Sequence, residues 1–536
     1  MDKNDKSTQK GNFVLVLVAM VLGVLIGLMC AGTFGRRPAS SSLQGKMDEV
    51  MTLVQREYVD TVDVDSLSEE LVAVLLGELD PHSTYLSARE AARTAEFMRG
   101  NFEGVGLVIH FEGDTNYVGH VMAGGPSDGS GLLPGDQIVT VDDDSVTGLP
   151  VDSVVTRLRG PRHTKVNIGV RRYDGDHGAS TPYRFTIRRG VVDQQSLPYS
   201  GMLDDTTGYI MLATFTATSH TEFRAALRQL KSRGMRHLIF DLRGNGGGSL
   251  QSAVGIVGEM LPAGNLIVYT QGAHSRRRDV RSHGGGLFTT GRVTVMIDEG
   301  SASASEVVAG ALQDNDRATV VGRRSFGKGL VQTEFNLSDG SSLLLTTARY
   351  YTPSGRCIQR SYDDGTDEYY RDYVQQLLDE TYADTAVASV KDSTPYYTVG
   401  GRVVYGGGGI IPDRIFTYRH DTTLVYYNRL SSNRLMSVTA FNYVRHHAGE
   451  LLRRYPDAES FYKGFRPDEA LVGEVVSRGE AAGVARDARS LQAQRHLIAN
   501  NLAAYVGQAL YGDAMLYRIL LREDDDLRKV MEVRGK

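Results

Sequence analysis

A run of small residues, GSASAS at 300–305, contains a serine, Ser303, that could act as a nucleophile. Apolar residues at helical spacing follow over 307–312, so Ser303 is expected at the start of a helix. There the positive end of the helix dipole favours developing negative charge, and small neighbours let a substrate backbone approach closely. The amide of Ala304 could donate a hydrogen bond to an oxyanion. This stretch is therefore a candidate centre for acyl transfer.

Lys328 is the candidate base for this serine, because no histidine motif lies nearby in the sequence. It stands in an apolar, glycine-lined turn. A lysine can act as a base only if loss of hydration lowers its pKa far enough to leave a neutral amine. Serine–lysine pairs are a known variant of the serine triad. Gln332 follows four residues later, so both side chains share one face if the segment is extended, and the glutamine could orient the amine.

Three other interpretations compete for the same residues. Ser303-x-x-Glu306 is a capping box, in which Ser303 would only cap the helix. Residues 322–329 read G-x-x-x-x-G-K-G, but a P-loop needs Ser or Thr at the last position and a following helix. Ser325-x-x-Lys328 matches the S-x-x-K of penicillin-recognising enzymes, without their S-D-N or K-T-G. The residues alone leave capping and catalysis open for Ser303 and disfavour the other two sites.

The whole stretch 298–332 resembles the active-site segment of the C-terminal processing peptidases, also called tail-specific proteases. That family has a serine in a small-residue run, a lysine in F-G-K-G and a glutamine four residues later. The resemblance extends over about 46–417 of this chain. It implies that Ser303 is the nucleophile, Lys328 the general base and Gln332 the residue that orients the lysine.

A glycine loop at 244–248 follows a buried strand and offers backbone amides. Strand and helix patterns alternate over 193–362, which predicts an α/β core with parallel pairing. Loops at the carboxyl ends of such strands commonly carry sites. Gly247 is therefore the predicted second oxyanion donor, beside Ala304.

The family pattern at this loop is D-L-R-x-N-x-G-G, usually with proline before the paired glycines, where this chain has Gly246. Asp241 and Arg243 in the same pattern are expected to form an ion pair that shapes the loop, rather than to act in catalysis.

Residues 98–192 show strand patterns and resemble a PDZ domain. In such a domain an extended peptide adds a strand to an open sheet edge, and successive backbone amides capture its terminal carboxylate. The matching carboxylate-binding loop consists of Val105, Gly106, Leu107 and Val108. A purely structural β domain is the alternative. A nucleotide site is disfavoured, because no acidic residue or helix follows at the required places.

Helices are predicted from apolar spacing before the PDZ-like region, over 46–97, and after the peptidase core, over 418–536. Residues 46–97 contain the heptapeptide DPHSTYL at 80–86, which resembles a segment before the PDZ domain of the family. His82 in this heptapeptide is expected to have a loop or capping role rather than to act as a base. In the family this region often helps to form a dimer or frames the site, which leaves a homo-oligomer open. Residues 418–536 could be a lid, a dimer surface or a docking platform.

Composition and charge narrow the class of protein. The 536 residues allow two to four domains, and hydrophobic and charged contents of 41% and 23% are ordinary for globular proteins. The net charge of −5, without a long basic run, argues against a nucleic-acid partner. Two cysteines, Cys30 and Cys357, exclude a disulfide framework. Without an H-E-x-x-H motif or a cysteine pair, neither a metal nor another cofactor is expected.

Residues 13–32 are uncharged, mostly apolar and long enough to span a bilayer core. A cleaved signal peptide would have a shorter apolar region and an A-x-A-like site. Cys30 raises the question of a lipoprotein signal, but Met29 is large where a small residue is needed. An uncleaved anchor is therefore favoured. Lysines in residues 1–12 indicate a cytoplasmic tail, although arginines after the apolar segment weaken this inference.

We therefore predict an α/β protein. Its peptidase core of mixed sheet and helices carries an inserted β-rich PDZ domain, an N-terminal transmembrane helix and a helical C-terminal extension. The predicted boundaries are a tail at 1–12, an anchor at 13–32, a linker at 33–45, helices at 46–97, the PDZ domain at 98–192, the peptidase core at 193–417 with an insertion at 363–395, and the helical region at 418–536.

The predicted function is that of a serine endopeptidase, held in the inner membrane by residues 13–32 with its catalytic part in the periplasm. It would process or degrade cell-envelope polypeptides whose accessible C-termini bind the PDZ domain. A non-catalytic PDZ scaffold is one rival, and the presence of Ser303, Lys328 and Gln332 argues against it. A hydrolase of non-protein substrates is a second rival, which the PDZ-like segment disfavours.

Overall fold

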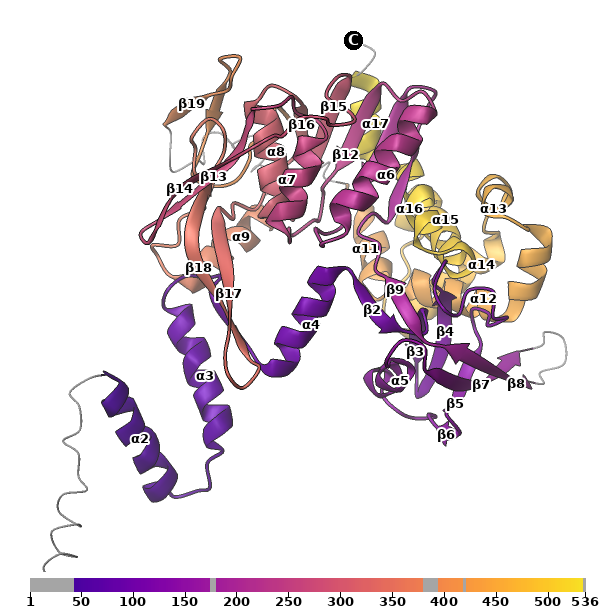
Figure 1. Ribbon diagram of the computed structural model, residues 1–536. Helices are drawn as coiled ribbons and strands as arrows, with labels where there is room; N and C mark the ends of the chain where they lie inside the picture. The colour runs from indigo at the N-terminus through magenta and orange to yellow at the C-terminus, as the bar shows by residue number, and fades with distance from the viewer. Residues whose placement is uncertain (1–42, 174–179, 379–393, 418–420, 534–536) are drawn as a thin grey trace, which may run out of the picture. The chain divides into compact units, whose positions relative to one another are not determined.

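The computed structural model describes residues 43–173, 180–378, 394–417 and 421–533 (Figure 1). The predicted tail at 1–12 and the predicted membrane segment at 13–32 lie outside these residues. Within the described ranges, no helix combines the length and the apolar character that a membrane crossing requires. The chain divides into two compact units, residues 1–76 and 77–536, and each is described by itself.

The described part of the first unit is helical, as the apolar spacing predicted. Helix α2 (Leu43–Glu57) begins within the stretch that was expected to be a linker. Helix α3 (Val64–Gly77) follows it. Apolar side chains on and between these helices are exposed to solvent, among them Val50, Leu53, Val59, Val74 and Leu75.

A six-stranded sheet forms the centre of the second unit (Figure 1). Its strands follow the order β10 (Tyr199–Met202), β11 (Thr207–Met211), β12 (His237–Asp241), β15 (Arg292–Ile297), β16 (Thr319–Gly322) and β21 (Arg414–Ile415). Neighbouring strands pair in parallel, except for β10 and β11, which are antiparallel. The parallel α/β core predicted from the alternating pattern is therefore confirmed.

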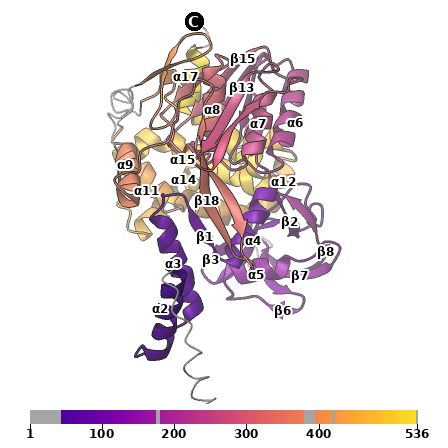
Figure 2. The ribbon, with the colours of Figure 1, turned by 60° about the vertical axis from the view of Figure 1, so that its left-hand side comes forward.

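The two faces of this sheet are covered by different parts of the chain, because successive side chains of a strand point to opposite faces. One face packs in a common core with α6 (Ser219–Ser232), α7 (Leu250–Gly258) and α8 (Ala304–Asp314). The other face packs against α17 (Asp525–Val533) from the C-terminal region (Figure 2). This second core contains the buried side chains of Tyr209, Ile239, Met296, Val321, Phe416, Leu527 and Val530.

A second, antiparallel sheet lies beside the first. Its order is β1 (Thr84–Leu86), β18 (Ser342–Tyr351), β13 (Leu266–Gly272) and β14 (Ser275–Arg281), and β17 (Leu330–Asn336) also pairs with β18. Strand β18 thus joins the heptapeptide at 80–86 to the hairpin that follows Lys328. Helix α4 (Ala88–Arg99) comes after β1 and begins with a capping box formed by Ser87 and Glu90.

The region predicted to be a PDZ domain is a small sheet packed on one helix. The strand order is β3 (Leu107–Glu112), β4 (Thr115–Val121), β5 (Gln137–Val141), β7 (Lys165–Tyr173) and β8 (Ser180–Arg188), with β6 (Asp144–Ser145) on β5. Helix α5 (Val151–Leu158) covers its core through Val154 and Leu158. β2 (Asn101–Gly104) pairs with β9 (Gly190–Asp193) where the chain enters and leaves the domain. Strand β3 is terminal, so no other described strand pairs with its outer edge.

The C-terminal region is helical, as predicted, and has a hydrophobic core of its own. It comprises α11 (Leu424–Ser432), α12 (Leu435–Arg454), α13 (Ala458–Gly464), α14 (Glu469–Ala481), α15 (Ala488–Tyr511), α16 (Asp513–Leu520), the 3-10 turn η2 (Leu521–Glu523) and α17. Phe441 of α12 packs against His110 and Tyr117 of the PDZ-like sheet. The predicted insertion begins with α9 (Thr366–Leu378), and β19 (Pro395–Tyr397) and β20 (Val403–Tyr405) form a hairpin after it.

Candidate active site

Ser303 lies between β15 and α8, at the carboxyl end of the parallel strands. Its backbone has φ 56° and ψ −112°, a conformation that residues other than glycine rarely adopt. An N-cap serine normally has extended backbone. Ser303 and Glu306 do form the predicted capping-box arrangement, but the Ser303 hydroxyl makes no cap hydrogen bond of normal geometry. A serine on a strained turn into a helix is typical of a nucleophile, so the geometry favours more than a capping role.

The Glu306 carboxylate joins the start of α8 to the loop that carries Lys328. Its Oε2 accepts hydrogen bonds from the amides of Ser303 at 2.8 Å and Lys328 at 2.9 Å. Its Oε1 accepts from Ser325 Oγ at 2.6 Å and from the Gly327 amide at 2.7 Å. Burial raises the pKa of Glu306 to about 7, although these four donors favour the ionised form. The S-x-x-E spacing predicted a capping role for Glu306. It did not indicate the hydrogen bonds that join Glu306 to the loop carrying Lys328.

The Tyr350 hydroxyl, from β18, makes a second link between the same two segments. It lies 2.6 Å from the Lys328 carbonyl oxygen and 3.1 Å from the Ser303 carbonyl oxygen, so its proton can be donated to either. Burial raises the pKa of Tyr350 well above 10, which keeps the hydroxyl protonated. Ser303 and Lys328 are thus each held at their amide by Glu306 and at their carbonyl by Tyr350. No sequence motif pointed to Tyr350.

Lys328 meets part of the requirement for a catalytic base. Burial lowers the pKa of its amine below 10.5, and the carboxylates of Glu306 and Asp80 oppose this shift. Within the described residues, Lys328 Nζ donates no hydrogen bond, so none connects it to Ser303 Oγ in this ligand-free structure. The structure therefore holds the two backbones together and leaves the amine without a fixed partner.

Gln332 belongs to a different set of hydrogen bonds from the one expected. Its Nε2 donates to Thr346 Oγ1 at 3.3 Å, and Thr346 Oγ1 donates to Asp80 Oδ1 at 3.1 Å. Lys328 precedes β17, and the pairing of β17 with β18 is irregular between Val331 and Gln332. The two side chains therefore do not share one continuous extended segment. The orienting role of Gln332 stays a prediction.

His82 lies beside Lys328 but is held by aromatic neighbours. Its Nε2 is 3.0 Å from the Tyr369 hydroxyl, and its ring packs edge-on against Tyr369 and Phe326. Burial, together with the charge of Lys328, lowers the pKa of His82 to about 4 against the opposing effect of Asp80. The imidazole is thus neutral at neutral pH, and its contacts agree with the predicted structural role.

The glycine loop lies directly against Ser303. Gly247 has φ 105°, and a Cβ placed there would lie 2.8 Å from Ser303 Cβ and 3.0 Å from the Ala304 nitrogen. The Gly247 amide donates to Asn245 Oδ1 at 2.9 Å, whereas the Ala304 amide has no acceptor among the described residues. The structure brings both predicted oxyanion donors next to Ser303, and the roles of all three residues stay predictions.

Asp241 and Arg243 form the ion pair predicted at the base of this loop. Arg243 Nη2 lies 2.6 Å from Asp241 Oδ2, and Asp241 is almost fully buried. The Tyr209 hydroxyl donates to the same carboxylate at 2.6 Å. Arg243 also pairs with Asp524, a contact that the sequence did not reveal.

The predicted peptide-binding loop leads into the terminal strand of the PDZ-like sheet. Val105 is buried, and Gly106 has φ 72°, where an added Cβ would lie 3.1 Å from Pro126 Cδ. Leu107 and Val108 begin β3, and the Val108 side chain is 39% exposed. An edge strand entered from a glycine turn is the geometry that strand addition by a peptide requires.

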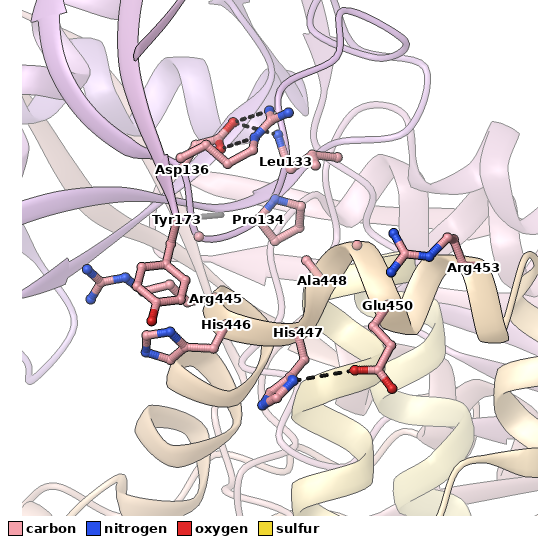
Figure 3. Close-up of a pocket in the computed structure, with 13 residues that line it drawn as sticks. Leu133, Pro134, Asp136, Tyr173, Arg445, His446, His447, Ala448, Glu450 and Arg453 are labelled. Carbon is pink, nitrogen blue, oxygen red and sulfur yellow. Dashed lines mark hydrogen bonds and ion pairs between the residues drawn. The ribbon is translucent and has the colours of Figure 1, made fainter. Parts of the chain in front are cut away.

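A separate cavity of about 720 Å³ lies between the PDZ-like sheet and α12 (Figure 3). Residues 133–136 line one side of it, and residues 445–450 with Arg453 line the other. His447 and Glu450 form a solvent-exposed ion pair at its rim. The cavity shares no residue with the candidate active site.

Comparisons with known proteins match three regions of this chain. Residues 206–367 match Peptidase family S41, residues 94–171 match the PDZ domain, and residues 426–512 match a family of unknown function (DUF8443). The carboxyl-terminal-processing protease of Synechocystis is 36% identical over 314 residues, which cover 57% of this chain and 71% of that protein.

A second relative shows the same relationship. The carboxy-terminal-processing protease of Bartonella bacilliformis is 34% identical over 321 residues, covering 59% of this chain and 72% of that protein. Among solved structures, a photosystem II D1 C-terminal processing protease is 29% identical, covers 59% of this chain and 84% of that chain, and gives a TM-score of 0.32.

Proposed function

Because this chain belongs to the C-terminal processing peptidases, which are PDZ-containing serine peptidases, we propose that it cleaves polypeptides with a dyad of Ser303 and Lys328. One observation carries this assignment. A single oxygen, Glu306 Oε2, accepts hydrogen bonds from the amides of both residues, at 2.8 and 2.9 Å. The two backbones are therefore neighbours, although 25 positions separate them in sequence.

The proposed reaction is acyl transfer. Ser303 Oγ attacks the carbonyl carbon of the scissile bond while the neutral amine of Lys328 takes the hydroxyl proton. The ammonium then gives this proton to the leaving nitrogen as the peptide bond breaks. Water hydrolyses the acyl-enzyme, with Lys328 again as the base.

The amides of Ala304 and Gly247 are the proposed oxyanion donors. The Gly247 amide is bound to Asn245 Oδ1 in the ligand-free structure, so it would exchange this acceptor for the oxyanion. Gln332 is proposed to orient the amine once a substrate is bound. Its amide now faces Thr346, whose hydroxyl connects it to Asp80.

Substrate selection is assigned to the PDZ domain, where a C-terminal segment would add to the outer edge of β3. Val105, Gly106, Leu107 and Val108 would receive the terminal carboxylate and the last residues. The terminal position of β3 in its sheet supports this assignment.

We place the protein in the inner membrane, with residues 13–32 as a single span and the catalytic part in the periplasm. The support is the length and apolar character of this segment and the lysines before it. The substrates would then be cell-envelope proteins. A homo-oligomer is also proposed, because exposed apolar side chains gather on α2 and α3.

The test uses the full-length chain in detergent with a casein as an unfolded substrate. Wild type, Ser303→Ala and Lys328→Ala would be compared by gel electrophoresis over time. Cleavage by wild type alone is the expected result. Cleavage by Ser303→Ala would contradict the assigned nucleophile, and cleavage by Lys328→Ala would contradict the assigned base. Absence of cleavage in all three, with and without added C-terminal peptides, would favour the PDZ scaffold.

A further inference from the structure

Two aspartates of the C-terminal region reach the back of the central sheet. Asp524 and Asp526 stand at the start of α17, which covers this face through Leu527 and Val530. The side chains of Asp524 and Asp526 are 17% and 14% exposed, so both carboxylates are largely removed from water.

Asp524 holds Arg243. Arg243 Nη2 lies 2.6 Å from Asp524 Oδ2, and Nη1 lies 3.2 Å from Oδ1, which is a two-point contact. Asp241 binds the same guanidinium from the core side at 2.6 Å. Burial alone would lower the pKa of Arg243, but Asp241 and Asp524 together raise it, so the charge is fixed.

Asp526 connects this arginine to a second one. Its Oδ2 lies 2.7 Å from Arg323 Nη1 and 3.8 Å from Arg243 Nη1. Arg323 also pairs with Glu299, at 3.1 Å. Burial alone would raise the pKa of Asp526, but Arg323 and Lys529 outweigh this effect and hold it below 3.8. Asp526 therefore stands between two guanidiniums that would otherwise repel each other.

The positions of these arginines in the chain link the cluster to the active site. Arg243 directly precedes the glycine loop, whose Gly247 lies against Ser303. Arg323 precedes the loop that ends at Lys328, and Glu299 lies four residues before Ser303. The three segments leave the carboxyl ends of β12, β16 and β15. The aspartates thus contact the bases of the glycine loop and the lysine loop, and Arg323 connects them to Glu299 in the segment that carries Ser303.

We propose that Asp524 and Asp526 are positioning residues for the peptidase reaction: by binding Arg243 and Arg323 they fix the glycine loop and the lysine loop against Ser303. The helical C-terminal region is then part of the catalytic geometry rather than a lid. This inference rests on the proposed function, because it assigns a role within the same site. It goes beyond the family resemblance, which ends near residue 417.

Amide hydrogen exchange tests the structural half of the proposal and needs no activity. The full-length wild type would be compared with Asp524→Asn, Asp526→Asn and the double variant. Asp525→Asn is the matched control, because Asp525 lies on the same turn but is exposed and pairs with exposed Arg528. Peptides covering 243–248 and 323–328 should exchange about tenfold faster in the double variant. Strand β7 should be unchanged, and so should every peptide of the control.

Kinetics test the functional half at a temperature where all variants are folded. We expect kcat for a short peptide to fall about 10- to 100-fold in the double variant, because small displacements of catalytic groups are costly. KM should stay within about twofold. Asp526→Glu should recover part of the activity, since it restores the carboxylate. A serine-directed phosphonate should label the double variant correspondingly slowly.

The possible outcomes separate this inference from the proposed function. Unchanged exchange at 243–248 and 323–328 would overturn the inference whatever the activity. A lower melting temperature with unchanged kcat would reduce the aspartates to a stabilising role and overturn it as well. An inactive wild type would contradict the proposed function, and exchange would still decide whether the aspartates hold the loops.

Discussion

Two buried polar clusters hold the same catalytic loops, and they do so with different chemistry. At Glu306 a carboxylate is surrounded by neutral donors, namely three backbone amides and the hydroxyl of Ser325. At Arg243 and Arg323 the charges are paired, with aspartates and a glutamate around two guanidiniums. The first cluster contacts the proposed catalytic residues, and the second contacts only the bases of their loops.

The difference concerns Lys328, which must lose its proton to act as the proposed base. An ionised carboxylate beside Lys328 opposes that loss, but the pKa of Glu306 is raised to about 7, so this opposition is incomplete near neutral pH. In the arginine cluster the pKa of Arg243 is raised and that of Asp526 is lowered, so these two charges do not change there. Charges that stay constant near neutral pH thus contact the bases of the loops. Glu306, next to the proposed dyad, changes its protonation state in that range.

The largest effect is expected from removing the amine. Lys328→Ala should lower kcat/KM for a peptide substrate by at least about 10⁴-fold, as loss of a dyad member does in serine hydrolases. The melting temperature should change little, because Glu306 binds the backbone amide of residue 328 rather than its side chain. Peptide hydrolysis and thermal unfolding by circular dichroism provide the measurements. Substantial residual turnover would remove Lys328 from the mechanism.

The contributions of the two clusters to the free energy of unfolding should change in different pH ranges. A carboxyl whose pKa rises from 4.5 to about 7 on folding stabilises the protein fully below pH 4.5, and this contribution is lost as pH rises through 7. Its loss amounts to at most about 3 kcal/mol of unfolding free energy. The pKa of Asp526 is lowered, so its contribution is complete above pH 3.8 and constant over that range.

Denaturant unfolding of wild type and Glu306→Gln between pH 4.5 and 7.5 measures this difference. The stability of wild type relative to the variant should fall as pH rises. A pH-independent difference would show that the Glu306 pKa is not raised. Asp526→Asn, measured in the same range, should give a constant difference from wild type.

Glu306→Gln should lower kcat/KM by about 10²-fold, because its NH₂ group would face amide donors and displace the Ser303 or Lys328 backbone. The matched control is Glu334→Gln on exposed β17, which should behave as wild type. Hydrolysis rates of the two variants, measured at one pH above 8, decide the point. Equal rates would show that Glu306 does not position the dyad.

The smallest effect is expected at Tyr350. Tyr350→Phe removes one hydrogen bond to the carbonyls of Ser303 and Lys328 and keeps the ring. The expected cost is about 1 kcal/mol of stability and about tenfold in kcat. Thermal unfolding and peptide hydrolysis are the measurements. An effect on stability without one on kcat would limit Tyr350 to a structural role.

Local patterns predicted much of the fold and the candidate catalytic residues. Helical spacing after residue 305 placed Ser303 at a helix start, and alternating strand and helix patterns indicated the parallel core. Glu306 was recognised as a cap because a capping box is local. Its bonds to Ser325, Gly327 and Lys328 cross about 20 positions of sequence and depend on the packing of β17 and β18, which no local pattern reveals.

Two further features of the site also lie beyond local sequence patterns. The expectation that Lys328 and Gln332 share one face assumed a regular strand. Lys328 instead precedes β17, and the pairing of β17 with β18 is irregular between Val331 and Gln332. Asp524 and Asp526 stand in an acidic run that looks solvated in the sequence. Their partners are 281 and 203 positions away, so only the docking of α17 could show them.

The backbone of Ser303 also has an evolutionary consequence. With φ 56° and ψ −112°, it has the conformation of the first central residue of a type II′ turn, where glycine is usual. Replacement by glycine should therefore stabilise the fold by about 1 kcal/mol while ending catalysis. A lineage that no longer needed proteolysis would drift toward glycine at position 303. Glycine at this position in a relative would accordingly mark a chain without the proposed chemistry.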